Sequence, residues 1–202
     1  TTLGVGAFAA LSACSSNTSL PSVSTSAAPG QPTAAAPLTP QAYDALILAG
    51  PVASDAVIAA SPWAQAIKAQ GFLRRGGAET SAIFSLKDPT TGRVTGFDAG
   101  LGDLLSRYIT GGQDVAKLSQ LTQVTSDTRE TVLQNKTVDT VIATYSITPQ
   151  RAEKITFAGP YYSSGASIQV KSDNTTIHSV ADLIAYGKAH PGALNVGHAG
   201  NG

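Results

Sequence analysis

The sequence predicts an α/β fold built around a largely parallel sheet. Strand-like segments alternate with helix-like segments along the chain, and this alternation favours parallel strands joined by helical crossovers. The run VDTVIATY (138–145) is largely apolar, which is typical of a strand covered on both faces. The clearest helix is expected to begin at Asp98, as its N-cap, and to end at the glycine pair 111–112. Apolar side chains recur between these points at helical spacing: Leu101, Leu104, Leu105, Tyr108 and Ile109.

Capping and turn signals predict the other elements. Ser61 and Pro62 predict the start of a helix that ends at Gly71. Turn residues within KDPTTGRVTGFD (87–98) predict a hairpin-like excursion. The remaining expected strands lie within 72–86, where a long loop follows the strand, and at 121–125, 154–159, 166–173 and 193–202. The remaining expected helices lie at 126–134, from Thr148-Pro149 onward, and at 180–190 behind a Ser179 cap.

The composition excludes some partners. The 202 residues carry 13 basic and 13 acidic side chains, and only 13% of the chain is charged. This balance leaves neither a basic footprint for nucleic acid nor a polybasic segment for a membrane surface. The lone cysteine, Cys14, allows no intramolecular disulfide. We therefore expect no nucleic-acid partner.

The N-terminal residues are expected to be a secretory signal remnant (1–14). Residues 3–13 are apolar and small, and too short to span a bilayer. The segment LSAC (11–14) resembles the lipobox of bacterial lipoproteins, which implies lipidation of Cys14. The alternative is an incidental cysteine in an ordinary small-residue segment. The chain opens with Thr1 and lacks a charged n-region, so we expect that the start of the signal is missing.

A linker is expected to follow the signal. Residues 15–40 are almost entirely Ser, Thr, Pro, Ala, Gly, Asn and Gln, and cannot bury enough apolar surface to offset chain entropy. We predict a disordered linker with a short helical lead-in over 15–61. Such a tether behind a lipid anchor would let the folded part sample the space near a membrane.

The segment SITPQR (146–151) follows the most apolar expected strand. In open α/β sheets, ligands bind at the carboxyl ends of the strands. Ser146 and Thr148 place hydroxyls there, and Thr148 with Pro149 places Arg151 in the first turn of a helix. A cation is unfavourable at that end of a helix unless an anion joins it. The pattern therefore indicates a carboxylate site, and the alternative is a surface Arg151 paired with Glu153 or Asp139.

Three stretches in this order resemble the bacterial extracellular solute-binding proteins of family 3, which deliver amino acids to ABC importers. They are FSLKDPTTGRVTGFDAGLGDLL (84–105), TRETVLQNKTVDTVIATYSITPQRAEKITFAGPYYSSG (128–165) and VADL (180–183). The amino-acid sequence of these stretches is most similar to that of glutamate-binding lipoproteins of actinobacteria. The resemblance implies a type II periplasmic-binding-protein-like fold with two lobes. Lobe one is expected over 62–168, and the crossover strand with the start of a largely missing lobe two over 169–202.

The resemblance implies roles for particular residues. The arginine of the motif binds the ligand's α-carboxylate, which is here Arg151, and Ser146 and Thr144 contact the same ligand. An aromatic residue covers the ligand, for which Phe84 is the nearest match, with a core role as the alternative. Many relatives have an aspartate for the ligand's amino group, but here Ala78 stands at the aligned position and Glu79 is a possible substitute. Asp98 is a signature residue that we interpret as a helix cap.

Two further features have open interpretations. Arg74 and Arg75 are expected at a solvated strand edge, although either one in the cleft would favour an acidic ligand side chain. The tail PGALNVGHAGNG (191–202) resembles binding proteins of tripartite tricarboxylate transporters. That resemblance implies second-lobe contacts from His198, Asn201 and Gly202, with an ordinary loop histidine as the alternative for His198.

The expected protein is the substrate-binding component of an ABC transporter, held outside the membrane as a lipoprotein. Its expected partners are a glutamate-like amino acid, a permease and the membrane, and a monomer without metal or cofactor is expected. The alternatives are a di- or tricarboxylate-binding protein and a ligand-sensing module. An enzyme of dehydratase type would need an acid or base in the cleft, for which only Glu79 is near, so no enzyme is expected. Because lobe two is expected to be largely missing, we expect weak or no ligand binding by this chain alone.

Overall fold

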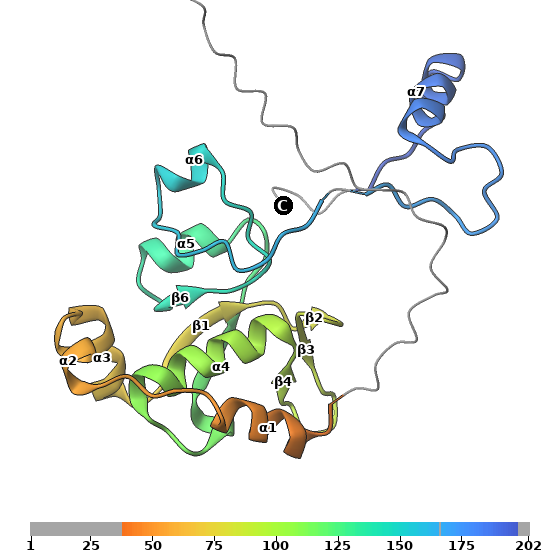
Figure 1. Ribbon diagram of the computed structural model, residues 1–202. Coiled ribbons are helices and arrows are strands. Elements are labelled where there is room, and N and C mark those ends of the chain that lie inside the picture. The colour runs from red at the N-terminus through yellow and green to blue at the C-terminus, as the bar shows by residue number, and fades with distance from the viewer. Residues whose placement is uncertain (1–37, 166, 198–202) are drawn as a thin grey trace, which may run out of the picture. The chain divides into compact units, whose positions relative to one another are not determined.

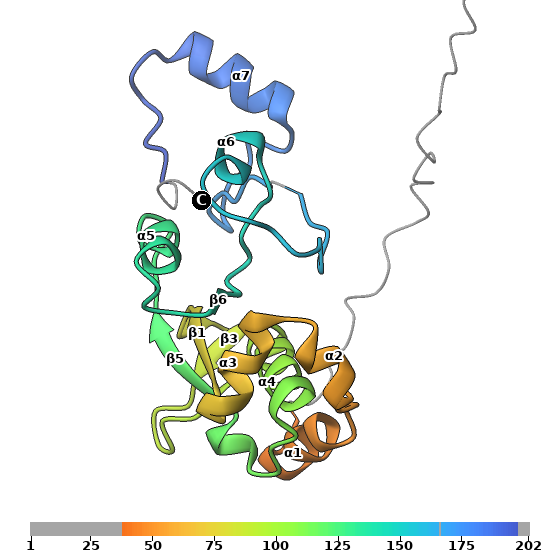
Figure 2. The same ribbon diagram turned by 90° about the vertical axis from the view of Figure 1, so that its left-hand side faces the viewer.

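Three parallel strands form the main sheet of the computed structural model, which describes residues 38–165 and 167–197 (Figure 1). β1 (Leu73–Gly77) lies between β5 (Ser119–Gln123) and β6 (Thr140–Val141). Leu73 is in register with Ser119, and Arg75 with Thr140. Figure 2 shows β5 and β1 side by side. The α/β class with a parallel sheet is confirmed, although β6 is shorter than the expected strand 138–145.

α4 (Phe97–Thr110) packs against β1 and connects the central strand to β5 through the short 3-10 helix η1 (Val115–Lys117). The expected apolar stripe of this helix packs against two apolar clusters. Leu104 lies against the cluster that contains Leu118, and Leu105 and Tyr108 lie against the cluster that contains Ile67. The face toward the sheet is made of small and polar residues. A Cβ on Gly102 would lie 2.3 Å from Cδ of Arg75, so glycine is needed for this approach. The helix ends, as predicted, at Gly111 in the left-handed conformation.

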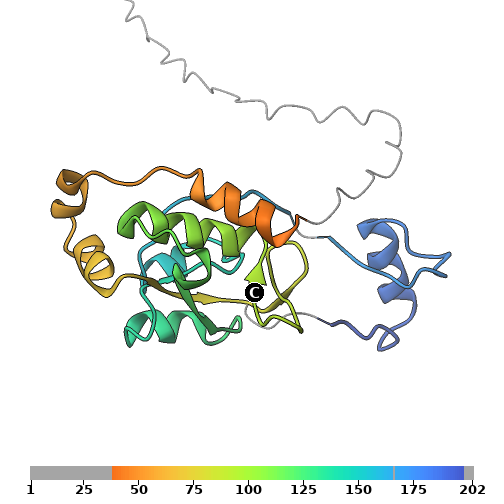
Figure 3. The same ribbon diagram turned by 90° about the horizontal axis from the view of Figure 1, so that it is seen from below.

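Two helices precede α3 (Pro62–Gln70) in a segment that was expected to be linker. They are α1 (Pro40–Leu48) and α2 (Asp55–Ala59). Tyr43 and Ile47 of α1 and Ile58 of α2 are buried in the two apolar clusters, and α1 lies alongside α4 (Figure 3). The expected short helical lead-in is therefore present, but 40–61 is not a disordered linker, because its apolar residues find long-range partners. Residues 15–37 of the expected linker lie outside the described residues.

A small antiparallel sheet forms the expected hairpin-like excursion. Its strands are β2 (Thr80–Ser81), β3 (Ser85–Lys87) and β4 (Val94–Thr95), in the order β2-β3-β4. The turn between β3 and β4 is held by Asp88, whose Oδ1 accepts hydrogen bonds from the N–H groups of Thr90 and Thr91. The sequence therefore predicted the turn, and the structure adds the side chain that holds it.

α6 and α7 follow their expected caps, whereas α5 begins later than the expected start of its helix at 126, and the later strands do not form. α5 spans Arg129–Gln134, α6 spans Pro149–Ala152 behind Thr148, and α7 spans Val180–Ala189 behind Ser179. Thr148 and Ser179 each accept a hydrogen bond from an N–H in the first turn, as predicted. The strands expected at 154–159, 167–173 and 193–197 are absent from the described residues, because these segments pair with no other backbone there. None of the helices in the described ranges has the length and apolar character needed to cross a membrane.

Candidate ligand-binding site

The loop after β6 begins with an unusual backbone at Thr144. Its φ is 48°, in the left-handed region that β-branched residues rarely adopt. The Thr144 N–H donates to Oδ2 of Asp98 at 3.0 Å and to the Tyr161 hydroxyl at 3.1 Å. Asp98 is 1% exposed, so this contact fixes the loop to the interior. The expectation that Asp98 caps α4 is wrong, because Gly96 precedes the helix and the carboxylate faces the loop instead.

Arg151 occupies the place that the sequence predicted. Thr148 Oγ1 accepts a hydrogen bond from the Arg151 N–H at 3.3 Å, so the residue lies in the first turn of α6. Its Nη1 donates to the carbonyl of Ser146 at 2.9 Å, and its guanidinium lies over the ring of Tyr145, 4.6 Å from the centroid. One of the two expected alternative partners is engaged by another residue. Asp139 is instead bound by Arg74.

A second guanidinium, that of Arg129, lies over the same Tyr145 ring at 4.3 Å. Arg129 is buried, and it donates to the carbonyl of Ala143 at 3.0 Å and to Oγ of Ser126 at 2.9 Å. Its Nε has no hydrogen-bond partner among the described residues. Burial lowers the pKa of Arg129, and the neighbouring charge of Arg151 lowers it further. Two cations, one from α5 and one from α6, therefore lie close to one aromatic ring of the loop.

The hydroxyl of Tyr145 connects this ring to an acidic residue. It donates to Oε1 of Glu130 at 2.8 Å, and Lys154 donates to the other oxygen of Glu130 at 3.0 Å. Burial raises the pKa of Tyr145, as do the hydrogen bond and charge of Glu130, so the phenol stays neutral and donates. Tyr145 is therefore held by a hydrogen bond at its hydroxyl and by two guanidinium groups at the face of its ring.

Two adjoining pockets open at this end of the sheet. The larger, of about 640 Å³, contains Arg151 and is lined by Ser126, Asp127, Glu130, Ser146, Thr148, Gln150, Arg151 and Lys154. The smaller, of about 490 Å³, contains Arg129 and is lined by Ala78, Thr80, Gln123, Val124, Thr125, Ser126, Arg129, Ala143 and Thr144. Ser126 lines both pockets. The smaller pocket lies where β1, β5 and β6 end, which is the edge where α/β sheets bind ligands.

The structure brings together three of the residues predicted for the site. Ser146 and Arg151 share the larger pocket, and Thr144 lines the smaller one. Glu79 does not line either of these pockets, and its carboxylate is bound by Lys87 at 3.2 Å on the antiparallel sheet. Phe84 is half-buried, lines neither pocket, and packs edge-on against the exposed rings of Phe97 and Tyr162, so its expected core alternative is wrong. Cys14, His198, Asn201 and Gly202 lie outside the described residues.

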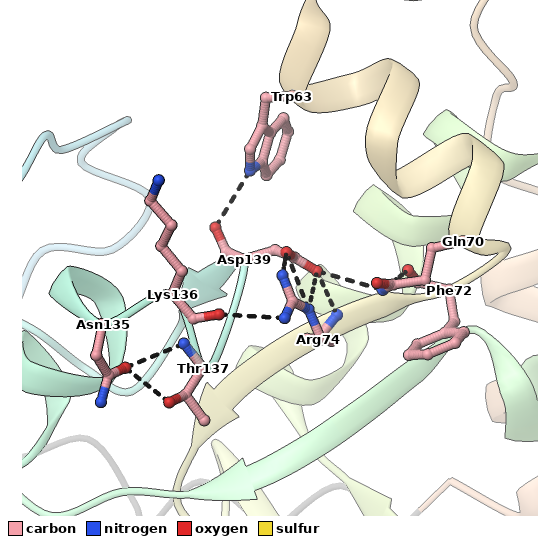
Figure 4. Close-up of polar contacts among 8 residues, drawn as sticks. All are labelled: Trp63, Gln70, Phe72, Arg74, Asn135, Lys136, Thr137 and Asp139. Atoms are coloured by element: carbon pink, nitrogen blue, oxygen red, sulfur yellow. Dashed lines mark hydrogen bonds and ion pairs between the residues drawn. The ribbon is translucent and has the colours of Figure 1, made fainter.

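The arginines of β1 do not line the pockets. Arg74 donates from its backbone N–H and its Nε to Asp139, at 2.9 Å and 3.1 Å, as Figure 4 shows. Arg75 is 2% exposed beneath α4, so its expected solvated position is wrong. Asp103 lies near it on α4, and Gly77 and Gly102 leave room for its side chain. Both charged side chains of β1 are therefore engaged away from the pockets: Arg74 pairs with Asp139, and Arg75 is buried near Asp103.

Sequence reasoning missed Ser126 and Arg129. Both lie in the segment VTSDTRE between the end of β5 and the first turn of α5, so their position after a strand was a usable signal. Arg129 lies within the helix expected at 126–134, and its burial depends on distant partners, Ala143 and Tyr145, that its neighbouring sequence does not indicate. Within the described residues, no group of His, Cys, Asp and Glu side chains is arranged to hold a metal ion.

Comparisons with known proteins identify the family of this chain. The family of "Bacterial extracellular solute-binding proteins, family 3" matches residues 73–196, more than half of the chain. A glutamine-binding protein from Geobacillus stearothermophilus is 38% identical over 117 residues, which cover 58% of this chain and 43% of that protein. The ABC transporter glutamine-binding protein GlnH of Bacillus subtilis is 36% identical over 101 residues, 50% of this chain and 36% of that one. The chain therefore spans less than half the length of these two relatives.

A solved structure supports the fold. The ancestral amino acid-binding protein AncCDT-1, described as a precursor of cyclohexadienyl dehydratase, matches with a TM-score of 0.51 and 33% identity. The match covers 59% of this chain and 51% of that one. The fold is that of the type II periplasmic binding proteins, as the sequence resemblance implied. This chain belongs to family 3 of the bacterial extracellular solute-binding proteins.

Proposed function

We propose that this chain is part of an amino-acid-binding protein that serves an ABC importer, and that Arg151 binds the α-carboxylate of the ligand. The observation that carries the proposal is the position of Arg151 in one pocket with the hydroxyls of Ser146 and Thr148. The Ser146 carbonyl and the Tyr145 ring orient its guanidinium. Relatives named as glutamine- and glutamate-binding proteins support an amino acid as the ligand.

An arginine in this position suits a carboxylate. Its planar fork can donate two parallel hydrogen bonds to the two oxygens, and hydrogen bonds to charged groups contribute about 1.5–3 kcal/mol each. The hydroxyls of Ser146 and Thr148 can add neutral donors to the same group. Thr148 already accepts from the Arg151 N–H, and its own O–H can still donate. The site therefore offers donors of the kind that an α-carboxylate needs.

The adjoining pocket supports a glutamate-like side chain. Arg129 places a second, buried cation there, together with the hydroxyls of Ser126 and Thr144. A side-chain carboxylate in this pocket would be attracted by the positive charge of Arg129, which lines it. Glu79 is bound by Lys87, so we do not propose it as the partner of the ligand's amino group.

We further propose that the protein works outside the cytoplasmic membrane as a monomer and performs no chemical reaction. Lipid on Cys14 would tether it, and the permease of the importer would receive the ligand. The basis is the sequence LSAC before a polar segment. Growth of a bacterium expressing the protein with an alkyne-tagged fatty acid should label it, and Cys14→Ser should abolish the label. Labelling of the serine variant would contradict the anchor.

The ligand proposal is tested by titration of the 202-residue chain. L-glutamate, L-glutamine and citrate are each added to ¹⁵N-labelled protein, and amide shifts are followed by NMR, a method that also detects weak binding. We expect both amino acids to shift amides near Ser146 and Arg151, with L-glutamate binding most tightly. Citrate that binds more tightly than both amino acids would overturn the proposal in favour of a di- or tricarboxylate-binding protein.

A sensing module would bind the same amino acids, so binding alone does not separate it from a transport component. Uptake of radiolabelled L-glutamate by cells that carry or lack the gene makes this distinction. We expect uptake to fall when the gene is deleted. Unchanged uptake, combined with binding in vitro, would favour the sensing module.

A further inference from the structure

The carboxylate of Asp98 joins the start of α4 to the loop after β6. Asp98 is the second residue of α4 and is 1% exposed, yet it neither caps its own helix nor lines either pocket. Its Oδ2 accepts the Thr144 N–H at 3.0 Å, although 46 residues separate the two in sequence. A buried carboxylate is unfavourable unless its hydrogen bonds compensate, so this contact needs a reason beyond filling space.

Thr144 needs such a contact because of its backbone. A β-branched residue with φ of 48° is disfavoured by steric overlap with its own carbonyl, and it keeps this conformation only where surrounding structure enforces it. The Thr144 hydroxyl donates to the carbonyl of Ala143 at 2.8 Å, which leaves its N–H pointing toward Asp98 and Tyr161. The chain bends here, where Ala143 and Thr144 both line the smaller pocket.

Tyr161 closes the same group of contacts from a third segment. Its hydroxyl accepts from Thr144 N at 3.1 Å and hydrogen-bonds the Asp98 carboxylate, while its ring stacks on Phe97. Burial and the charge of Asp98 raise the pKa of Tyr161 to about 12, so the phenol remains a donor at neutral pH. The loop is therefore held between the N-terminus of α4 and the segment that leaves the lobe.

We propose that Asp98 is a positioning residue for ligand binding: its carboxylate holds Thr144 in the left-handed conformation and so directs Tyr145 and Ser146 into the site. This inference rests on the proposed function, since it assumes that this loop receives the ligand. Arg151 depends on the same loop, because it donates to the Ser146 carbonyl and lies over the Tyr145 ring. Asp98 thus acts on the ligand only through residues that it orients.

Opposing effects of the surroundings act on the pKa of Asp98. Burial raises its pKa, while hydrogen bonds from Tyr161 and Thr144 and the nearby guanidinium of Arg75 act in the opposite direction. Arg75 also lies close to Asp103, a second buried acid of α4. Asp103 accepts hydrogen bonds from Tyr43, at 2.9 Å, and from Ser119, and these partners lie away from the loop. Asp103 is therefore a matched control for Asp98.

Three variants of the 202-residue chain test the proposal: Asp98→Ala, Asp98→Asn and Asp103→Ala. The readouts are the Kd for L-glutamate by NMR titration, the exchange rate of the Thr144 amide proton, and Tm. We expect Asp98→Ala to weaken binding about tenfold and to speed exchange of that proton. Asparagine keeps an oxygen that accepts the Thr144 N–H, so Asp98→Asn should stay within about threefold of the wild type while lowering Tm. Asp103→Ala should lower Tm and leave Kd unchanged.

The outcomes separate this proposal from the proposed function. Equal loss of affinity in Asp98→Ala and Asp103→Ala, or in Asp98→Ala and Asp98→Asn, would overturn the positioning role and leave amino-acid binding in place. Tighter binding of citrate than of both amino acids by the wild-type chain would overturn the proposed function. If Asp98→Ala does not fold, the wild type still decides, since a Thr144 amide that exchanges as fast as the exposed Ile147 amide would show that no such hydrogen bond holds the loop.

Discussion

The guanidinium of Arg151 lies over the ring of Tyr145, 4.6 Å from its centroid. Arg129 lies over the same ring at 4.3 Å, so one aromatic side chain contacts two cations. A ring face attracts a cation and restricts where its planar group can lie. Tyr145 therefore contacts both Arg151, which the sequence predicted for the site, and Arg129, which it did not.

Replacement of Tyr145 tests this relationship. We expect Tyr145→Ala to weaken L-glutamate binding by about 0.5–2 kcal/mol, because each guanidinium loses its cation–π contact. Tyr145→Phe keeps the ring and loses only the hydrogen bond to Glu130, so its affinity should stay close to that of the wild type. Isothermal titration calorimetry measures both. Equal weakening in the two variants would assign the effect to the hydroxyl rather than to the ring.

Arg129→Gln tests the second pocket. Loss of the buried cation should cost L-glutamate about 1.5–3 kcal/mol of binding free energy, because a charged hydrogen bond is lost. L-glutamine has a neutral side chain and should lose less, so the preference for glutamate over glutamine should fall. The glutamine titration thus serves as an internal control for any general change in the fold. An unchanged ratio of the two affinities would place the ligand side chain elsewhere.

Local signals in the sequence predicted local structure correctly. Ser61, Thr148 and Ser179 each precede a helix and accept a hydrogen bond from its first turn, and Gly71 and Gly111 end helices in the left-handed conformation. These features depend on residues within one turn of each other, so the neighbouring sequence is enough to predict them. The place of Arg151 follows from such a cap.

Long-range contacts could not be predicted in the same way. The segment with α1 and α2 is rich in alanine and other apolar residues, and Tyr43 and Ile47 of α1 pack in one cluster with Val115 and Leu118, far along the chain. Conversely, the segment 154–159 has strand-like residues but no neighbouring backbone to pair with in the described structure. Phe157 packs against Tyr145 instead. The contact of Asp98 with Thr144 and the burial of Arg129 are likewise tertiary, so the capping interpretation of Asp98 failed.

The Arg74–Asp139 pair predicts a pH dependence of stability. Burial opposes ionisation of Asp139, but hydrogen bonds from the side chain and backbone of Arg74 outweigh it, and the pKa of this carboxyl lies below its ordinary value. The unfolded chain therefore binds a proton there at a pH where the folded chain does not. The pair stabilises the fold above the ordinary Asp pKa of about 3.9, and this contribution is lost as the pH falls through the lowered pKa.

Asp139→Asn measures this contribution by urea unfolding at about pH 7 and at about pH 3. The side chain of Asp139 is 10% exposed and that of Arg74 is 37% exposed, so we expect a cost of about 1–2 kcal/mol at the higher pH. The difference from the wild type should shrink at the lower pH. Asp55→Asn removes the exposed pair with Lys68 and should change stability at neither pH. An effect of Asp139→Asn that persists at low pH would contradict the role of its charge.

Capture of the ligand's α-carboxylate by Arg151 is the central claim, and calorimetric titration of L-glutamate into Arg151→Ala tests it most directly. Lys154→Ala is the matched control, because Lys154 is a cation of the same pocket that pairs with Glu130. We predict that Arg151→Ala weakens binding by at least about tenfold while Lys154→Ala stays within about threefold of the wild type. Wild-type affinity in Arg151→Ala, with Tm unchanged, would contradict the claim.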